Sequence, residues 1–349
     1  MRLAFVGDVM LGRLVNAHLR AVPPAFPWGD ALPLLLQSDL RFCNLECALS
    51  DRGEPWAETP KTFHFRSDTK CVAVLEAAHM DAVSLANNHT LDYGYEALGD
   101  TLDTLDAAGI AHAGAGRNLL EAAEPARLER SGARVAFLAF TDNEPDWAAG
   151  PDRPGVYYVP AEPDDARFGN LLDRVRDVRP TCEILIVSTH WGPNWGREPS
   201  PEHVTCARAL IENGADIVFG HSCHTFRGVG IHNGRPILYS TGDFIDDYAV
   251  DPTERNDQGF VYIVNTDAGS WRMCLHPTVI RDYHAGLAHG DEARAIGEHI
   301  LERCAALGTP ATWDPRSMCV RIAMPAPPPP PPWDHRHTDP LTADEGEGI

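Results

Sequence analysis

Short apolar runs that end directly in a polar residue recur along this chain and constrain its fold more than any other feature. The segments are LAFVGD, DLRFCNLE, AVSLANNH, EILIVSTH and ADIVFGHSCH. Their composition is typical of strands buried on both faces, as in a parallel sheet. Each run ends in an aspartate, glutamate, asparagine or histidine. Because the carboxyl ends of parallel strands lie at one sheet edge, five such ends predict a shared site, and their side-chain types predict a metal.

The order of the predicted elements indicates one continuous α/β body over residues 1–324. Strand-like runs alternate with helical stretches over 1–140, and further strand and helix units follow over 165–219. This alternation is typical of right-handed βαβ units. Antiparallel strands joined by turns are predicted over 226–282, and a helix and a strand close the body over 290–323.

The last residues, 325–349, differ from the rest of the chain. An uninterrupted proline run from Pro327 to Pro332 is followed by a polar, acidic segment with few core-forming residues. This composition is typical of an extended, solvated tail, which we favour. A docking arm or a lid is the alternative.

Composition excludes several classes of function. The 349 residues include 44% hydrophobic residues but no apolar stretch of about 18, which indicates a globular protein without a membrane span. The first residues lack the pattern of a signal peptide, so a cytoplasmic location is expected. A net charge of −21 disfavours binding to nucleic acid or to an anionic membrane surface. The nine cysteines show no disulfide framework.

Six motifs together resemble the CapA-like proteins, a branch of the calcineurin-like metallophosphoesterase superfamily that is named for poly-γ-glutamate capsule synthesis. They follow the family's order over roughly residues 3–282 and are GDVMLGR, NLECALS, LANNHTLDYG, STHWG, GADIVFGHSCHTFRGV and ILYSTGDFIDDYAVD. The resemblance implies the calcineurin-like metallophosphoesterase fold, an α/β fold in which a sandwich of two β-sheets is flanked by helices. It also implies a metal centre at the ends of the sheets.

The resemblance implies a set of metal ligands with carboxylate, amide or imidazole groups. Taken motif by motif, the expected ligands are Asp8, Glu46, Asn88, His190, His221 and His224. Such ligands suit a divalent ion such as Mn, Mg, Zn, Fe or Ca rather than a thiolate-selective metal. Met10 stands where the superfamily has a histidine, and GHSCH has one residue more than the superfamily's GHxH. Both departures affect the first metal, so we expect one tight site and a weaker second site.

Four residues are candidates for proton transfer. His89 occupies the position of the superfamily's acid, and Asp92 either orients it or caps the helix that follows. Asp8 is the third candidate. Cys223 lies between two histidines and could be an acid or base, although a buried cysteine with a packing role is the simpler interpretation. The acidic residues of 241–248 either line the pocket or form a turn.

Three functions fit these residues. We favour metal-dependent epimerisation at Cα of the C-terminal residue of a ribosomally made peptide, because one branch related to CapA-like proteins acts in this way on lasso precursor peptides. It requires one Lewis acid and a pair of proton-transfer groups. A metal-dependent hydrolase of phosphoesters or amides is the alternative, and the altered first-metal motif disfavours its two-metal form. The second alternative is a capsule assembly component, which is disfavoured because no anchor or signal is recognised. The expected substrate is therefore a peptide or a small phosphorylated compound.

Overall fold

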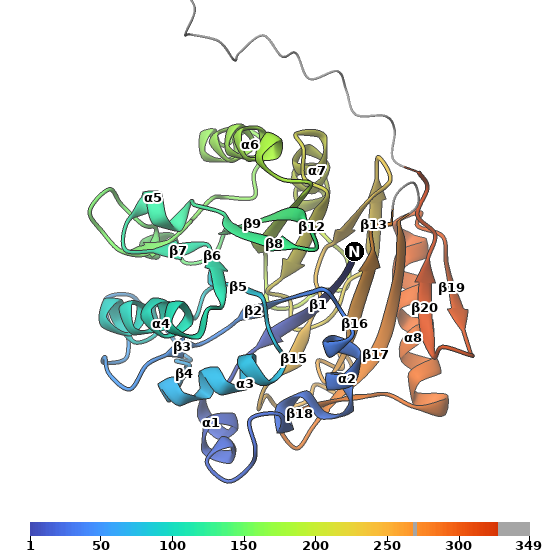
Figure 1. Cartoon of the computed structure of the whole chain (residues 1–349), viewed down its shortest axis with the longest axis horizontal. Helices are drawn as coiled ribbons and strands as arrows, with labels where there is room; N and C mark the ends of the chain where they lie inside the picture. The colour runs from blue at the N-terminus through green and yellow to red at the C-terminus, as the bar shows by residue number, and fades with distance from the viewer. Residues whose placement is uncertain (268–270, 327–349) are drawn as a thin grey trace, which may run out of the picture.

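Two β-sheets packed face to face form the body of the molecule, with helices on their outer faces (Figure 1). The structure, a computed structural model, describes residues 1–267 and 271–326. The predicted tail, residues 325–349, lies outside the described residues apart from its first two. The predicted α/β architecture with two sheets is confirmed.

The larger sheet has ten strands and β1 (Arg2–Val9) at its centre. In sheet order the strands are β19 (Ala311–Asp314), β20 (Cys319–Ile322), β17 (Arg272–Arg281), β16 (Gln258–Asn265), β1, β2 (Leu40–Leu45), β5 (Ala82–Ser84) and β6 (Ala111–Ala113), with β15 (Asp243–Ile245) paired to β1 and β18 (His284–Leu287) to β17. The strands from β1 to β6 are parallel, and those from β16 to β19 are antiparallel. The sequence predicts this change of direction after residue 226.

The smaller sheet has six strands, four of which are parallel. In sheet order they are β13 (Val229–His232), β14 (Arg235–Leu238), β12 (Ile217–His221), β11 (Ile184–His190), β9 (Ala133–Thr141) and β8 (Ala126–Arg130). The sequence does not predict β8, because its ARLER segment is mostly exposed and lacks an apolar run. Two short pairs complete the strands, β3 (Ala48–Leu49) with β4 (Arg66–Ser67) and β7 (Ala115–Gly116) with β10 (Gly155–Val156).

A layer of phenylalanine rings joins the two sheets. Phe5 and Phe42 stack on neighbouring strands of the larger sheet, with 5.1 Å between ring centroids. Phe42 stacks on Phe137 of the smaller sheet at 5.3 Å, and Phe5 contacts Phe219 at 5.2 Å. All four rings are fully buried. Burial of one such ring stabilises the fold by about 1.5–3 kcal/mol, so this layer holds the sheets together at the centre of the sandwich.

Helices cover the outer face of each sheet (Figure 1). Those that pack on the larger sheet are α1 (Arg13–Leu19), α2 (Leu32–Leu36), α3 (Val72–Ala77) and α4 (Gly94–Ala108). Those that pack on the smaller sheet are α5 (Leu119–Ala122), α6 (Ala166–Val178) and α7 (Pro201–Glu212), whereas α8 (Gly290–Ala306) contacts both sheets. Short 3-10 helices span Phe26–Ala31, Thr69–Cys71, Pro145–Trp147 and Arg179–Thr181. Gly109 ends α4 in the left-handed conformation, with φ of 68°, as its sequence position predicts.

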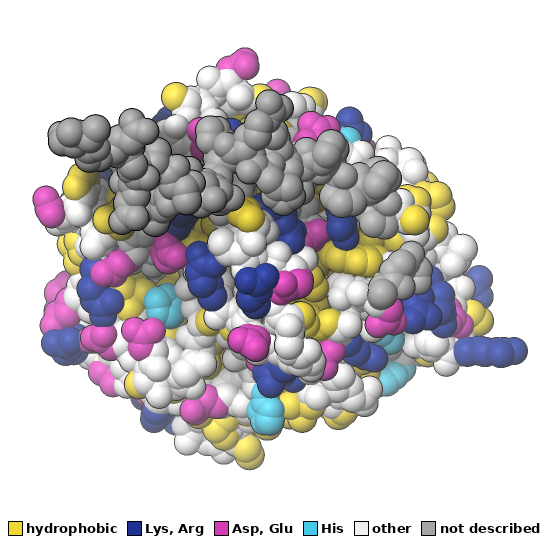
Figure 2. Space-filling view, turned by 45° about the horizontal axis from the view of Figure 1, so that its top comes forward, with side chains coloured by type: hydrophobic (Ala, Val, Ile, Leu, Met, Phe, Trp, Pro, Cys, Tyr) yellow, Lys and Arg dark blue, Asp and Glu magenta, His cyan; other side chains and the backbone are white. Residues whose placement is uncertain are grey.

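Basic and acidic side chains are interspersed over the face shown in Figure 2. The net charge of −21 is therefore not gathered into a single patch on this face. Within residues 1–267 and 271–326, no helix has the length and apolar composition needed to span a membrane.

Candidate metal centre

The predicted ligands meet where strand ends of the two sheets face each other. Asp8 lies near the end of β1, and Glu46 directly follows β2. His190 and His221 end β11 and β12, where the two residues lie in register on neighbouring parallel strands. All four side chains are at most 1% exposed. The structure thus brings together residues that are up to 213 positions apart in the sequence.

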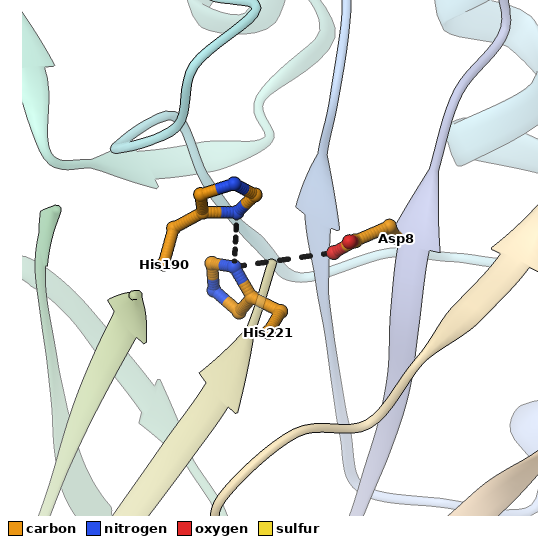
Figure 3. Close-up of side chains that lie close together, drawn as sticks. All are labelled: Asp8, His190 and His221. Carbon is orange, nitrogen blue, oxygen red and sulfur yellow. Dashed lines mark hydrogen bonds and ion pairs between the residues drawn. The ribbon is translucent and has the colours of Figure 1, made fainter. Parts of the chain in front are cut away.

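One potential ligand group combines imidazole and carboxylate. Asp8, His190 and His221 each offer a ligand atom, and these atoms all lie within 4.8 Å of one another (Figure 3). The two histidine Nδ1 atoms are 2.9 Å apart, and Nδ1 of His221 is 3.9 Å from Oδ1 of Asp8. The Ser188 hydroxyl lies 2.8 Å from Nε2 of His221. A proton shared there leaves Nδ1 free to act as a ligand.

A second potential group consists of carboxylates alone. One oxygen each from Asp8, Glu46 and Asp243 lie within 4.8 Å of one another. Asp243 begins β15 and pairs in register with Asp8 on β1. The two strands approach so closely that a Cβ on Gly7 would lie 1.8 Å from the carbonyl oxygen of Gly242. Glycine at position 7 is therefore required to bring Asp243 beside Asp8.

Buried polar atoms without hydrogen-bond partners gather in this region. They are Oδ2 of Asp8, Oδ1 of Asn88, Nε2 of His190, Oδ2 of Asp243 and Oδ2 of Asp246. Each unpartnered buried polar atom costs about 1–3 kcal/mol, and a buried charge without a partner costs more. Oxygen and imidazole donors suit the divalent ions expected from the sequence. The residues present therefore fit a divalent cation.

Burial moves the pKa values in opposite directions on the two kinds of ligand. Burial, with the like charge of Asp243, raises the pKa of Asp8 to about 8. Burial also raises the pKa of Glu46 and of Asp243 well above their ordinary values. It lowers the pKa of His221 to about 3 and that of His190 well below its ordinary value. The imidazoles are thus in the neutral form that binds metals, and a cation would displace protons from the carboxyls.

His89 and Asp92 form a buried pair of titratable side chains. Nδ1 of His89 lies 2.5 Å from Oδ2 of Asp92, which also accepts the backbone N–H of Phe65 at 2.6 Å. The ring of Phe65 stacks on His89, with 3.9 Å between centroids. Of the two roles left open for Asp92, the structure supports orientation of His89. The helix-capping role is not observed, because the N-cap residue of α4 is Tyr93.

Lys61 is a buried cation that the sequence does not predict. Its Nζ atom donates to the carbonyl of Asn88 at 2.6 Å and to Glu144 at 3.0 Å, and it lies 3.5 Å from Oδ1 of Asp92. It also packs over the Trp147 ring. Lys61 lies in an irregular segment between β3 and β4, where no strand end or motif marks it. It fixes the backbone of one predicted ligand and the carboxylate of the buried pair.

A chain of side-chain amides connects Asp8 with His89. Asn44 donates to Oδ1 of Asp8 at 2.9 Å, and Asn87 donates to the amide oxygen of Asn44 at 2.9 Å. Asn87 in turn accepts the backbone N–H of His89 at 2.9 Å. A structural role for Asn87 is what the sequence predicts. Asn44 was missed, although it stands two residues before Glu46 in the NLE motif.

The last two predicted residues take different positions. Nδ1 of His224 lies 3.0 Å from Oδ1 of Asp243, which places this histidine beside the carboxylate group. Cys223 is fully buried, and its sulfur contacts the carbonyl of Gly196 at 3.2 Å and the hydroxyl of Thr225 at 3.4 Å. Neither of these hydrogen bonds connects Cys223 with a predicted metal ligand. Proton transfer by Cys223 stays a prediction.

Comparison with known proteins assigns the chain to a family. Residues 2–248 match the family described as bacterial capsule synthesis protein PGA_cap. The chain belongs to this family. The predicted relationship to the CapA-like proteins is thereby confirmed.

Three relatives illustrate how closely this PGA_cap member resembles other proteins. A probable polyglutamine synthesis accessory protein of Mycobacterium tuberculosis is 38% identical over 280 residues, which cover 76% of this chain and 73% of that protein. The PGA biosynthesis protein CapA of Bacillus subtilis is 29% identical, over 80% of this chain and 71% of its own length. The capsule biosynthesis protein CapA of Bacillus anthracis is also 29% identical, over 81% and 68% respectively.

Proposed function

We propose that this chain is a metal-dependent hydrolase that cleaves amide bonds in a polymer of glutamate or glutamine residues and acts alongside polymer synthesis. The observation that supports it best is the buried His89–Asp92 pair, which a chain of hydrogen bonds through two asparagines connects with Asp8 of the cation-ligand set. The substrate class comes from the relatives, whose names refer to capsule and polyglutamine synthesis. These names favour the capsule-synthesis alternative over the epimerase that the sequence alone favours.

The residues of the site have complementary roles in amide hydrolysis. A divalent cation held by the ligand set would act as a Lewis acid on the scissile carbonyl. Asp92 accepts the Nδ1 proton of His89 and thereby selects the tautomer in which Nε2 has a free lone pair. His89 can then take a proton from the attacking water and deliver it to the departing nitrogen. Lys61 holds Asp92 in place for this task.

Two other reactions have less support. Epimerisation needs an acid and a base on opposite faces of Cα, and His89 supplies one of them. Asp8, a further candidate, belongs to both groups of potential cation ligands. The hydrogen bonds of Cys223, the second candidate, lead to Gly196 and Thr225. Phosphoester hydrolysis would use the same ligands and the same histidine, but the relatives' names refer to capsules and polyglutamine. Amide hydrolysis agrees best with the site and with these names together.

The test uses the full chain, stripped of metal and reloaded with Mn or Zn. It is incubated with poly-γ-glutamate and with polyglutamine, and new amino groups and polymer length are measured. We expect metal-dependent release of amino groups that is lost in His190→Ala and strongly reduced in His89→Gln. His232→Ala is the matched control, because this partly exposed histidine pairs with Glu212 on the surface.

Two results would contradict the proposal. The first is release of amino groups that does not require a metal, or no release with any of the cations tested. The second is equal release by the wild type and His190→Ala. Deuterium incorporation at Cα of a peptide in deuterium oxide, without release of amino groups, would instead support the epimerase.

A further inference from the structure

The resemblance described above already implies a second cation position; we infer that Asp243 is a ligand of it and that the two positions prefer cations of different chemical class. Asp8, Glu46 and Asp243 form an all-oxygen position for a hard cation. This position lies next to the one that His190 and His221 supply with imidazole nitrogen. The inference concerns cation binding alone and does not depend on the reaction proposed above.

The oxygens of the carboxylate position are poised to receive a cation. Asn44 donates to Oδ1 of Asp8 at 2.9 Å, and His224 contacts Oδ1 of Asp243 at 3.0 Å. The other oxygen of each, Oδ2, is buried and has no hydrogen-bond partner. Asp8, Glu46 and Asp243 are each 1% exposed, so these side chains have almost no contact with bulk solvent. Each aspartate is thus held by a neighbour through one oxygen and keeps a second oxygen free.

The charge of this group is not balanced by basic side chains. Across residues 1–267 and 271–326, no lysine or arginine forms an ion pair with these three carboxylates, which contact histidines. A fourth buried carboxylate nearby, Asp246, adds to the negative charge. Three buried carboxylates in mutual contact repel one another unless they are protonated or share a cation. A cation relieves both the repulsion and the missing hydrogen bonds.

Met10 explains why this position needs Asp243. The superfamily motif that the sequence resembles has a histidine here, but the Met10 side chain is fully buried in the apolar core. Its sulfur accepts the backbone N–H of Gly12 at 3.0 Å. The pairing of β15 with β1 supplies an aspartate from the other side of Asp8. The loss of the histidine is therefore compensated from a strand far along the chain.

The two positions differ in the metal that they prefer. Carboxylate oxygens alone select hard cations such as Mg, Ca or Mn, whereas imidazole ligands favour Zn, Fe or Mn. Asp8 belongs to both ligand groups, so it is the shared ligand. We expect Zn to fill the imidazole position and Mg or Mn to fill the carboxylate position.

The experiment counts the ions bound to the metal-stripped full chain, without substrate. Zn is added first and Mn second, free ions are removed by gel filtration, and each element is then measured per chain. We expect one Zn and one Mn in the wild type. Asp243→Ala should keep Zn but bind Mn at least about tenfold more weakly, and His221→Ala should lose Zn. Asp81→Asn is the control, because this carboxylate pairs with Arg41 at the opposite end of β5 and should keep both ions.

Two results of the ion count would contradict a role for Asp243 as a ligand. A single ion per wild-type chain, or unchanged Mn binding in Asp243→Ala, would overturn it. If Asp243→Ala does not fold, as judged by circular dichroism, Asp243→Asn preserves the side-chain shape and must show the same weakening of Mn binding. Because no substrate is present, failure of the amide hydrolysis assay leaves this result unchanged, and failure here leaves the imidazole site and the hydrolase proposal intact.

Discussion

The two sheets supply chemically different halves of the candidate centre. The smaller sheet contributes imidazole through His190 and His221 at the ends of β11 and β12. The larger sheet contributes carboxylate through Asp8, Glu46 and Asp243, which lie on or next to β1, β2 and β15. Neither sheet holds both ligand types. The difference teaches that the centre exists only when the sandwich is closed, so cation binding and sheet packing must depend on each other.

Burial also shifts the pKa values of the two halves of the centre in opposite directions. Burial leaves the imidazoles neutral and ready to bind, whereas it raises the pKa of the carboxyls so that they hold protons until a cation arrives. Histidine binding is therefore available over a wide pH range. Carboxylate binding has to displace protons and is expected to depend strongly on pH.

Removal of one imidazole should produce the largest effect. We expect His190→Ala to lower the rate of the metal-dependent reaction by about a thousandfold, because Lewis-acid catalysis contributes several kcal/mol to the barrier. Measurement of kcat/KM together with bound metal would test this. His232→Ala, on the surface, should leave both values unchanged. A rate within about tenfold of the wild type would show that the reaction does not need the imidazole ligands of the smaller sheet.

The second largest effect should come from removal of an aromatic ring that joins the two sheets. Phe137 is fully buried and stacks on Phe42 across the sandwich. We expect Phe137→Ala to reduce the free energy of unfolding by about 3–5 kcal/mol, measured by urea denaturation. It should also weaken metal binding, because the two halves of the centre separate more easily. Phe63→Ala, which removes a ring that is 58% exposed, should change stability by less than about 0.5 kcal/mol.

Replacement of the buried Lys61 should have a smaller effect on the reaction rate, through residues that follow β5 of the larger sheet. Lys61 holds the Asn88 carbonyl and the Asp92 carboxylate. We expect Lys61→Met to lower kcat by about 10–100-fold, the range typical of residues that position ligands. Lys70→Met is the matched control, because this lysine is 64% exposed and pairs with Asp68 on the surface. Equal kcat values in the two variants would show that Lys61 has no role in the reaction.

The smallest expected effect is a shift in melting temperature with pH. The pKa of Asp8 rises from 3.8 to about 8 in the folded protein through burial. Between these values the folded state binds more protons than the unfolded state, so stability falls as pH rises. Metal-stripped protein should lose about a few degrees in Tm between about pH 7 and pH 8, and Mn-loaded protein should not. This window lies above the ordinary histidine pKa of about 6.5, so the buried imidazoles, whose pKa values are lowered, do not oppose the trend. Scanning calorimetry of both forms checks this, and a rising Tm in the stripped form would contradict it.

The sequence predicts those parts of the site that end long, regular strands. Glu46, His190 and His221 each follow a run of buried apolar residues, and such runs predict both the strand and the place where it ends. The alternation of these runs with helical stretches predicted an α/β fold, and the resemblance to the CapA-like family implied its two sheets.

Other parts of the site depend on pairings that have no local signal. Asp243 begins a strand of three residues, and its partner strand lies more than two hundred residues earlier. Lys61 lies in an irregular segment that the tertiary fold places against Asn88. The expectation of a weaker second site rested on Met10 and on the extra residue in GHSCH, and it did not count Asp243 among the ligands. A residue that reaches the site through tertiary packing cannot be recognised from periodicity.

The central position of β1 has a consequence for synthesis of the chain. β1 is made before the other strands of its sheet, yet two of its three neighbours, β15 and β16, are made more than two hundred residues later. Until then one edge of this apolar strand lacks its hydrogen-bond partners, and such edges readily pair with other chains. During synthesis, β1 is therefore open to pairing with other chains until the β15 and β16 segments leave the ribosome. Asp8 and Asp243 can come together only after that point.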